Sequence, residues 1–127
     1  MTHHFHVRVY YEDTDLAGIV YYANYLKFIE RARSEWVRDL GIDQNAMKAE
    51  DVVFAVRRVE ADYLQPAKFD DQLDIETSVH MVKPARLVVR QQVKRHGQTL
   101  FDALVTIICM TQAGRPTRLP KVLQDLA

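Results

Sequence analysis

The sequence has one cysteine, no net charge and no apolar run of membrane-spanning length, and each of these absences excludes a class of protein. Seventeen Lys and Arg residues balance seventeen Asp and Glu residues, which argues against a protein whose main task is to wrap nucleic acid. No window reaches the roughly 18 to 20 apolar residues of a bilayer span, and the N-terminal stretch lacks the apolar core of a signal peptide. We therefore expect a protein that is neither exported nor inserted into a membrane.

Cys109 is the single cysteine, so it cannot form a disulfide within the chain. It lies in the apolar run from Leu104 to Met110, where a free cysteine is usually buried. Disulfides are typical of oxidising compartments. We therefore expect a buried thiol in a cytoplasmic protein.

Metal-binding side chains are also scarce at ligand spacing. His3, His4 and His6 stand together, but no Cys, Glu or second histidine cluster accompanies them, and a zinc site needs three or four such ligands. His80 and His96 fall on the polar phase of expected strands, so we expect them at the surface. The sequence predicts no metal and no cofactor.

Periodicity divides one expected domain, residues 1–127, into one long helix and several strands. The helix should bury one stripe of residues, namely Tyr25, Ile29, Ala32, Trp36 and Leu40. We place its first turn near Tyr22 or Ala23, with Asn24 as the only good capping side chain, and its end at Gly41. An Arg31–Glu35 pair should lie on the exposed face.

The strands follow a period of two. A short strand is expected over residues 5–11, and two strands over residues 73–81 and 87–93 should form a hairpin broken at Pro84. Residues 100–110 are almost continuously apolar, which predicts a strand covered on both faces. The alternation slips at Arg57 and Arg58, which predicts a β-bulge. The pattern indicates an α+β fold with one helix beside an antiparallel sheet of about five strands.

One polar motif carries candidate chemistry: residues 12–25, with the sequence EDTDLAGIVYYANY, run from three acids into the start of the helix. Asp15 could supply a base or a nucleophile, and the free N–H groups at the helix start could stabilise an oxyanion. The alternative is a polar turn in which Asp13 and Asp15 bond their own loop.

This motif and its sequel, NYLKFIERARSEW, resemble the signature of the 4-hydroxybenzoyl-CoA thioesterase family of hotdog-fold proteins, nearest its Tol-Pal-associated acyl-CoA thioesterase branch. The resemblance continues through residues 62–67 (DYLQPA), Asp70-Asp71, Arg115-Pro116 and Leu119-Pro120. It implies a hotdog fold, in which the sheet wraps around the helix. It also implies an enzyme that hydrolyses an acyl-CoA to the free acid and coenzyme A.

The resemblance also implies roles for two residues. Asp15 takes the position of the catalytic carboxylate, and the backbone N–H of Tyr22 takes that of the oxyanion donor. The Tol-Pal-associated branch commonly has His at the position of Tyr22, whereas the 4-hydroxybenzoyl-CoA enzymes have Tyr. A thioester has a good leaving group, so the absence of a G-x-S-x-G elbow does not count against hydrolysis. Asp15 could attack directly or activate water.

Further residues are candidates for substrate binding. Gly18 could allow close approach of a ligand or supply a turn with positive φ. Coenzyme A carries phosphates that need cations. We therefore consider the acyl or coenzyme A contacts to include Val56, Arg57, Arg58, Lys83 and Arg86.

Two other functions remain open from the sequence. One is a non-hydrolytic subunit on the same fold that binds acyl-CoA or an acyl carrier protein. The other is a hotdog dehydratase or hydratase, but neither an H-x-x-x-x-G-x-P nor a D-x-N-P-x-H sequence occurs. The resemblance also implies a homodimer or homotetramer with active sites between subunits. A physical argument agrees: one helix covers only part of such a sheet, so we expect a second copy to cover the rest.

Overall fold

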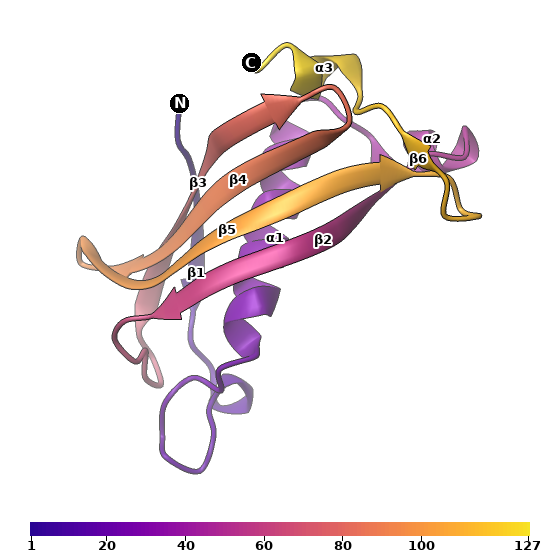
Figure 1. Ribbon diagram of the computed structural model, residues 1–127. Helices are drawn as coiled ribbons and strands as arrows, with labels where there is room; N and C mark the ends of the chain where they lie inside the picture. Colours follow the sequence, from indigo (N-terminus) through magenta and orange to yellow (C-terminus); the bar gives the residue numbers. More distant parts are fainter.

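The computed structural model of the protein describes residues 1–127 as one antiparallel sheet packed on one long helix (Figure 1). The strand order is β1-β3-β4-β5-β2, and a short sixth strand pairs with β5. The strands are β1 (His3–Arg8), β2 (Val53–Tyr63), β3 (Gln72–Lys83), β4 (Arg86–Arg95), β5 (Gln98–Met110) and β6 (Pro116–Thr117). The predicted α+β class is confirmed.

Helix α1 (Asn24–Asp39) lies against one face of the sheet and carries the predicted apolar stripe. Four of the five predicted stripe residues are buried, and Leu40 is half-buried. Phe28 and Val37 join the core as well. The helix ends before Gly41, whose φ of 86° lies in the left-handed region that favours glycine.

Two details of the helix prediction were wrong. Asn24 does not cap α1: the N-cap is Ala23, and the Asn24 side chain donates instead to the carbonyl of Asp13 at 3.0 Å. Glu35 pairs with Arg38, at 3.4 Å, and not with Arg31. In both cases more than one nearby residue could take the role, as the N-cap or as the partner of Glu35, and the sequence pattern does not show which one does.

Three short helical segments complete the chain: η1 (Tyr11–Asp13), α2 (Gln44–Ala49) and α3 (Lys121–Gln124). Asp43 caps α2, because its carboxylate accepts the N–H groups of Asn45 and Ala46. The segment η1 replaces the end of the first predicted strand, so β1 stops at Arg8 and the prediction that it extends to Tyr11 was wrong. No helix has both the length and the apolar character to span a bilayer.

The hairpin of β3 and β4 and the bulge in β2 are confirmed. The register of β2 against β5 shifts between Val56 and Arg58, so the extra residue returns Val59 to the same face as Val56. That face is the one toward α1, because Val56 pairs with Ile107 and Val59 with Val105, and both partners are buried. The bulge therefore keeps one apolar stripe on β2 facing the helix.

Strand β5 lies between β4 and β2, but it is covered on one face only. Buried residues alternate with half-buried ones along it, and Phe101, Ala103 and Val105 point into the core beneath α1. Leu104 and Ile108 lie on the other face and are half-buried. The predicted burial of both faces was therefore wrong for a single chain. Cys109 is buried as expected, and desolvation raises the pKa of its thiol to about 11.

Candidate active site

A hollow of about 390 Å³ lies where the loop before α1 meets the end of β2. In Figure 1 this is the end of the molecule at which α1 begins and β2 finishes. Both predicted catalytic residues, Asp15 and Tyr22, line it. Its lining is Asp15, Ile19, Val20, Tyr21, Tyr22, Tyr25, Tyr63, Leu64, Gln65 and Pro66.

The loop that carries Asp15 is closed by its own backbone. The Asp15 N–H donates to the carbonyl of Ile19 at 2.9 Å, and the Gly18 N–H donates to the carbonyl of Asp15 at 3.0 Å. Gly18 has a φ of 78°, and a Cβ there would meet no atom within 4 Å. The backbone conformation of this turn, and not crowding within the chain, therefore explains the glycine.

The Asp15 carboxylate is exposed and only partly engaged. Its Oδ1 accepts the N–H of Ala17 at 2.9 Å, which is the turn contact that the sequence suggested. Its Oδ2 accepts no hydrogen bond from the protein, so this oxygen can reach a substrate carbonyl or a water molecule. The turn and the reactive group are thus compatible functions of one side chain.

Asp13 anchors the loop to the helix start. Its Oδ2 accepts the N–H of Tyr10 at 2.8 Å, and its carbonyl accepts both the N–H of Tyr21 at 2.9 Å and the amide of Asn24. Asn24 is buried. These bonds fix the loop relative to the first turn of α1.

Two free backbone donors lie immediately before the first turn of α1. The Tyr21 carbonyl accepts the N–H of Asn24 at 2.8 Å, whereas the N–H groups of Tyr22 and Ala23 donate to no protein atom. Such free donors, together with the positive end of the helix dipole, favour negative charge. The helix start can therefore stabilise an oxyanion.

Tyr63 was not among the residues singled out in the sequence, although it lies in the DYLQPA segment that carries the family resemblance. Its hydroxyl donates to the carbonyl of Tyr22 at 2.9 Å. Its ring packs edge-on against Tyr25 and Phe101 at centroid distances of 5.5 and 4.9 Å. Of the six tyrosines, only Tyr25 is buried in the core.

Two phenols of this hollow, those of Tyr21 and Tyr63, have raised pKa values. Interaction with the Tyr22 phenol raises the pKa of Tyr21, and the Asp15 carboxylate acts in the same direction. Desolvation raises the pKa of Tyr63. Both phenols therefore stay neutral and can donate hydrogen bonds throughout the neutral pH range.

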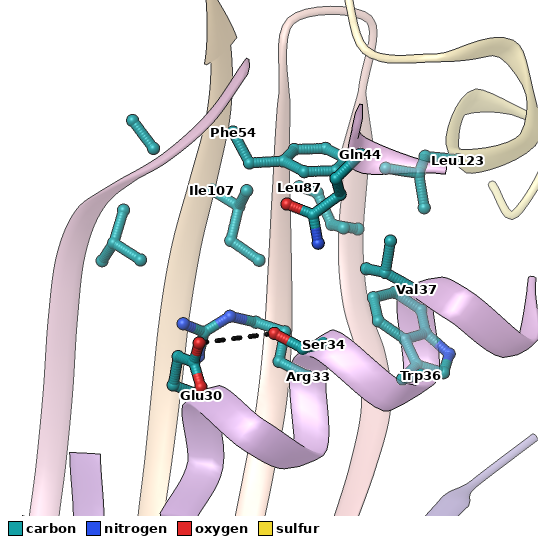
Figure 2. A pocket seen from close by; sticks show the side chains of 12 residues that line it. Glu30, Arg33, Ser34, Trp36, Val37, Gln44, Phe54, Leu87, Ile107 and Leu123 are labelled. Atoms are coloured by element: carbon teal, nitrogen blue, oxygen red, sulfur yellow. Dashed lines mark hydrogen bonds between the residues drawn. The ribbon is translucent and has the colours of Figure 1, made fainter. Parts of the chain in front are cut away.

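A second pocket, of about 200 Å³, lies further along α1 between the helix and the sheet (Figure 2). Its lining is mostly apolar and includes Val56, one of the predicted contact residues. Figure 2 shows Glu30, Arg33 and Ser34 of α1 opposite Phe54, Leu87 and Ile107 of the sheet. On α1 the pocket begins at Glu30, roughly 9 Å from the first helical residue, Asn24, at ~1.5 Å of helix per residue.

The predicted cationic contacts do not gather at the Asp15 hollow within one chain. Arg57 and Arg58 lie at the bulge of β2, where Arg58 pairs with Glu60 at 3.1 Å. Lys83 and Arg86 flank the turn between β3 and β4, which lies at the opposite end of the sheet from the start of α1 (Figure 1). Only a neighbouring chain could bring them to the hollow.

One group of possible metal ligands comes together across β1 and β3. Ligand atoms of His4, Asp74 and Glu76 lie within 4.8 Å of one another, which the sequence could not indicate because the carboxylates come from a distant strand. His4 is paired with Asp74 at 3.0 Å and Glu76 with Lys94 at 3.1 Å. A hydrogen bond of His4 to Asp74 and an ion pair of Lys94 with Glu76 thus already engage these three side chains. His80 and His96 are exposed, as predicted.

Sequence comparison finds relatives over nearly the whole chain. The profile of the thioesterase-like superfamily matches residues 9–126. The acyl-CoA thioester hydrolase YbgC of Escherichia coli O6:H1 is 42% identical over 117 residues, which are 91% of this chain and 87% of the relative.

Solved structures of similar proteins agree with the sequence comparison. A probable thioesterase from Bartonella henselae is 37% identical and superposes with a TM-score of 0.89, covering 94% of this chain and 100% of that one. A 1,4-dihydroxy-2-naphthoyl-CoA thioesterase from Synechocystis superposes with a TM-score of 0.90 over 99% and 95% of the two chains. It is 21% identical, so this second likeness speaks for the fold alone.

Proposed function

The chain belongs to the thioesterase-like superfamily of hotdog-fold proteins, and we propose that it hydrolyses an acyl-CoA to the free acid and coenzyme A. The family and fold predicted from the sequence are thereby confirmed, and relatives named YbgC agree with the predicted branch. The observation that carries the proposal is that Asp15 and the free N–H of Tyr22 line one hollow.

We propose Asp15 as the nucleophile. A carboxylate is a weak base at neutral pH, and the Oδ2 of Asp15 is free to attack. It would form a bond to the thioester carbonyl carbon while the carbonyl oxygen becomes an oxyanion held by the Tyr22 N–H. Collapse breaks the C–S bond, and the thiolate of coenzyme A leaves and takes a proton from solvent. Water then hydrolyses the mixed anhydride, which releases the acid and restores Asp15.

The acyl group would lie along the helix-facing stripe of β2. Val59 and Tyr63 on this stripe are 40% and 49% exposed, and Leu26 of α1 is 41% exposed. Apolar side chains left open between a helix and an edge strand offer a surface for an acyl chain. Gly18 would contribute by shaping the Asp15 turn.

We further propose that the active protein is a dimer formed through β2. This strand ends the sheet, has 11 residues and leaves one side of its backbone unpaired, and a long exposed edge favours pairing with another chain. Pairing of two β2 strands would bring residues 56–58 of one chain to the Asp15 hollow of its partner. Arg57, Arg58, Lys83 and Arg86 would then contact the phosphates of coenzyme A from the partner's side.

A screen for thiol release from short, long and aromatic acyl-CoAs tests the activity. An acyl carrier protein thioester should be included as the second substrate, and Asp15→Asn serves as the blank. If the wild-type protein bound these thioesters but released thiol no faster than the blank, a binding subunit would replace the enzyme as the better description.

We further propose that the reaction takes place in the cytoplasm. The protein has a single cysteine and therefore no internal disulfide, which is typical of proteins in a reducing compartment.

Rapid quenching separates the two roles of Asp15. A nucleophile should leave the acyl group on the peptide that contains Asp15 when one turnover is stopped in acid and examined by mass spectrometry. A burst of thiol without any acylated peptide would assign Asp15 to activation of water.

A further inference from the structure

The hydrogen bond between Tyr63 and the carbonyl of Tyr22 joins the end of β2 to the first turn of α1. The distance is 2.9 Å, and the two residues are far apart in the sequence. Tyr22 precedes the helix, and its carbonyl accepts no backbone N–H. The phenol of Tyr63 therefore takes a place that a helical N–H fills in later turns.

This bond fixes a peptide unit at the helix start. The carbonyl of Tyr22 and the N–H of Ala23 belong to one planar peptide group and point in opposite directions. The preceding peptide group carries the N–H of Tyr22, and it is held through the Tyr21 carbonyl by the N–H of Asn24 at 2.8 Å. Each of the two free donors is thus oriented by a bond to the carbonyl of its own peptide group.

The two restraints differ in origin. The bond from Asn24 is a local turn contact, whereas the bond from Tyr63 comes from a strand. Tyr63 is itself held in place, because its ring packs against Tyr25 and Phe101, which stack at a centroid distance of 5.0 Å. A hydrogen bond to a carbonyl also polarises its peptide group and strengthens the N–H on the other side.

We propose that Tyr63 is a positioning residue for the oxyanion site: it holds the Tyr22–Ala23 peptide group, whose free N–H, that of Ala23, adds a second donor to the N–H of Tyr22. This inference rests on the proposed hydrolysis. It assigns no contact between Tyr63 and the reacting atoms. The proposal explains why β2 ends in a partly exposed tyrosine, since the ring of a phenylalanine could make the same packing contacts.

Tyr63→Phe tests the proposal because it removes the hydroxyl and keeps the ring. We expect kcat to fall roughly 10-fold, less than the loss of a whole oxyanion donor, with KM unchanged. The matched control is Tyr11→Phe, since the Tyr11 ring stacks on Phe69 outside the hollow at 4.6 Å. This control should keep wild-type kcat and KM.

A second readout does not depend on turnover. The amide nitrogen of Ala23 should change its NMR shift in Tyr63→Phe and not in Tyr11→Phe, because only the first change removes a bond to that peptide group. Unchanged kcat in Tyr63→Phe beside an inactive Asp15→Asn would refute the role of Tyr63 and leave the proposed function intact. A rise in KM and a lower melting temperature without a fall in kcat would also refute it. Full activity of Asp15→Asn would instead refute the proposed mechanism.

Discussion

Arg33 of α1 donates a hydrogen bond to the Oε1 of Gln91 in the middle of the sheet, at 2.9 Å. Gln91 is fully buried, and its amide nitrogen donates to the Ile29 carbonyl at 2.8 Å and to the Thr77 hydroxyl at 3.0 Å. None of the ion pairs of the protein includes Arg33, and burial lowers the pKa of its guanidinium. Gln91 therefore provides hydrogen-bond partners for the Arg33 guanidinium, the Ile29 carbonyl and the Thr77 hydroxyl.

Gln91→Leu should destabilise the protein by about 2 to 3 kcal/mol, because it leaves the half-buried Arg33 and the buried Thr77 without their hydrogen-bond partner. The midpoint of urea unfolding measures the loss. The neighbouring Gln92→Leu, on the outer face of the sheet, is the control and should change stability by less than about 0.5 kcal/mol. Combining Gln91→Leu with Arg33→Met should recover part of the loss, since the unpaired charge is then gone. No recovery in the double variant would contradict this account.

Asp15→Asn should lower kcat by about 100-fold or more with little change in substrate affinity, because it keeps the shape and removes the charge. Thiol release measures this change. Asp13→Asn should act mainly on stability, because Asp13 accepts the N–H of Tyr10, so its melting temperature should fall at least as clearly as its rate. Retained turnover in a folded Asp15→Asn protein would remove Asp15 from the mechanism.

Substitutions at Tyr22 separate its backbone from its side chain. Tyr22→Phe should retain most of the activity, whereas Tyr22→Pro deletes the N–H and should largely abolish it. Tyr22 precedes the helix and its N–H has no partner in the chain, so proline breaks no hydrogen bond there, and circular dichroism checks that the variant folds. If Tyr22→Phe were as inactive as Asp15→Asn, the phenol itself would take part in the reaction.

Subunit exchange tests the composite site. We expect Asp15→Asn and Val56→Arg each to be inactive, and their mixture to regain about a quarter of wild-type activity, because half of the dimers would then hold one native site. A mixture of Asp15→Asn with Tyr22→Pro should regain nothing, since both changes fall on the same side of each site. If light scattering at assay concentration showed that the fully active protein is a monomer, the dimer proposal would be wrong.

The pair of Arg90 and Asp102 should make stability depend on acid pH. Two hydrogen bonds from Arg90, at 3.2 and 2.8 Å, hold the pKa of the Asp102 carboxyl below its usual range. The contribution of this pair is therefore present above the unfolded pKa of about 3.9 and is lost as the pH falls through the lower folded value. Asp102→Asn should melt roughly 2 °C below wild type at pH 7. The two curves should converge once the pH has fallen below the folded pKa of Asp102, and a constant gap would contradict the assignment.

The sequence by itself determined the elements and the reactive motif. The stripe from Tyr25 to Trp36 specified α1, the alternation around Pro84 specified the hairpin of β3 and β4, and the slip at Arg57 specified the bulge. These features succeed as predictors because each depends on residues that are close along the chain. The placement of Asp15 just before a helix start is local in the same way.

Only the tertiary structure decided which distant groups meet. The bond from Tyr63 to Tyr22 and the pairing of His4 with Asp74 join residues from separate elements, and no local period encodes such contacts. The sequence likewise could not show that β5 is covered on one face in a single chain, because a continuous apolar run does not reveal how many layers cover it. Burial depends on what packs against a strand, and that is decided by the arrangement of the whole sheet, the helix and, in our proposal, a second chain.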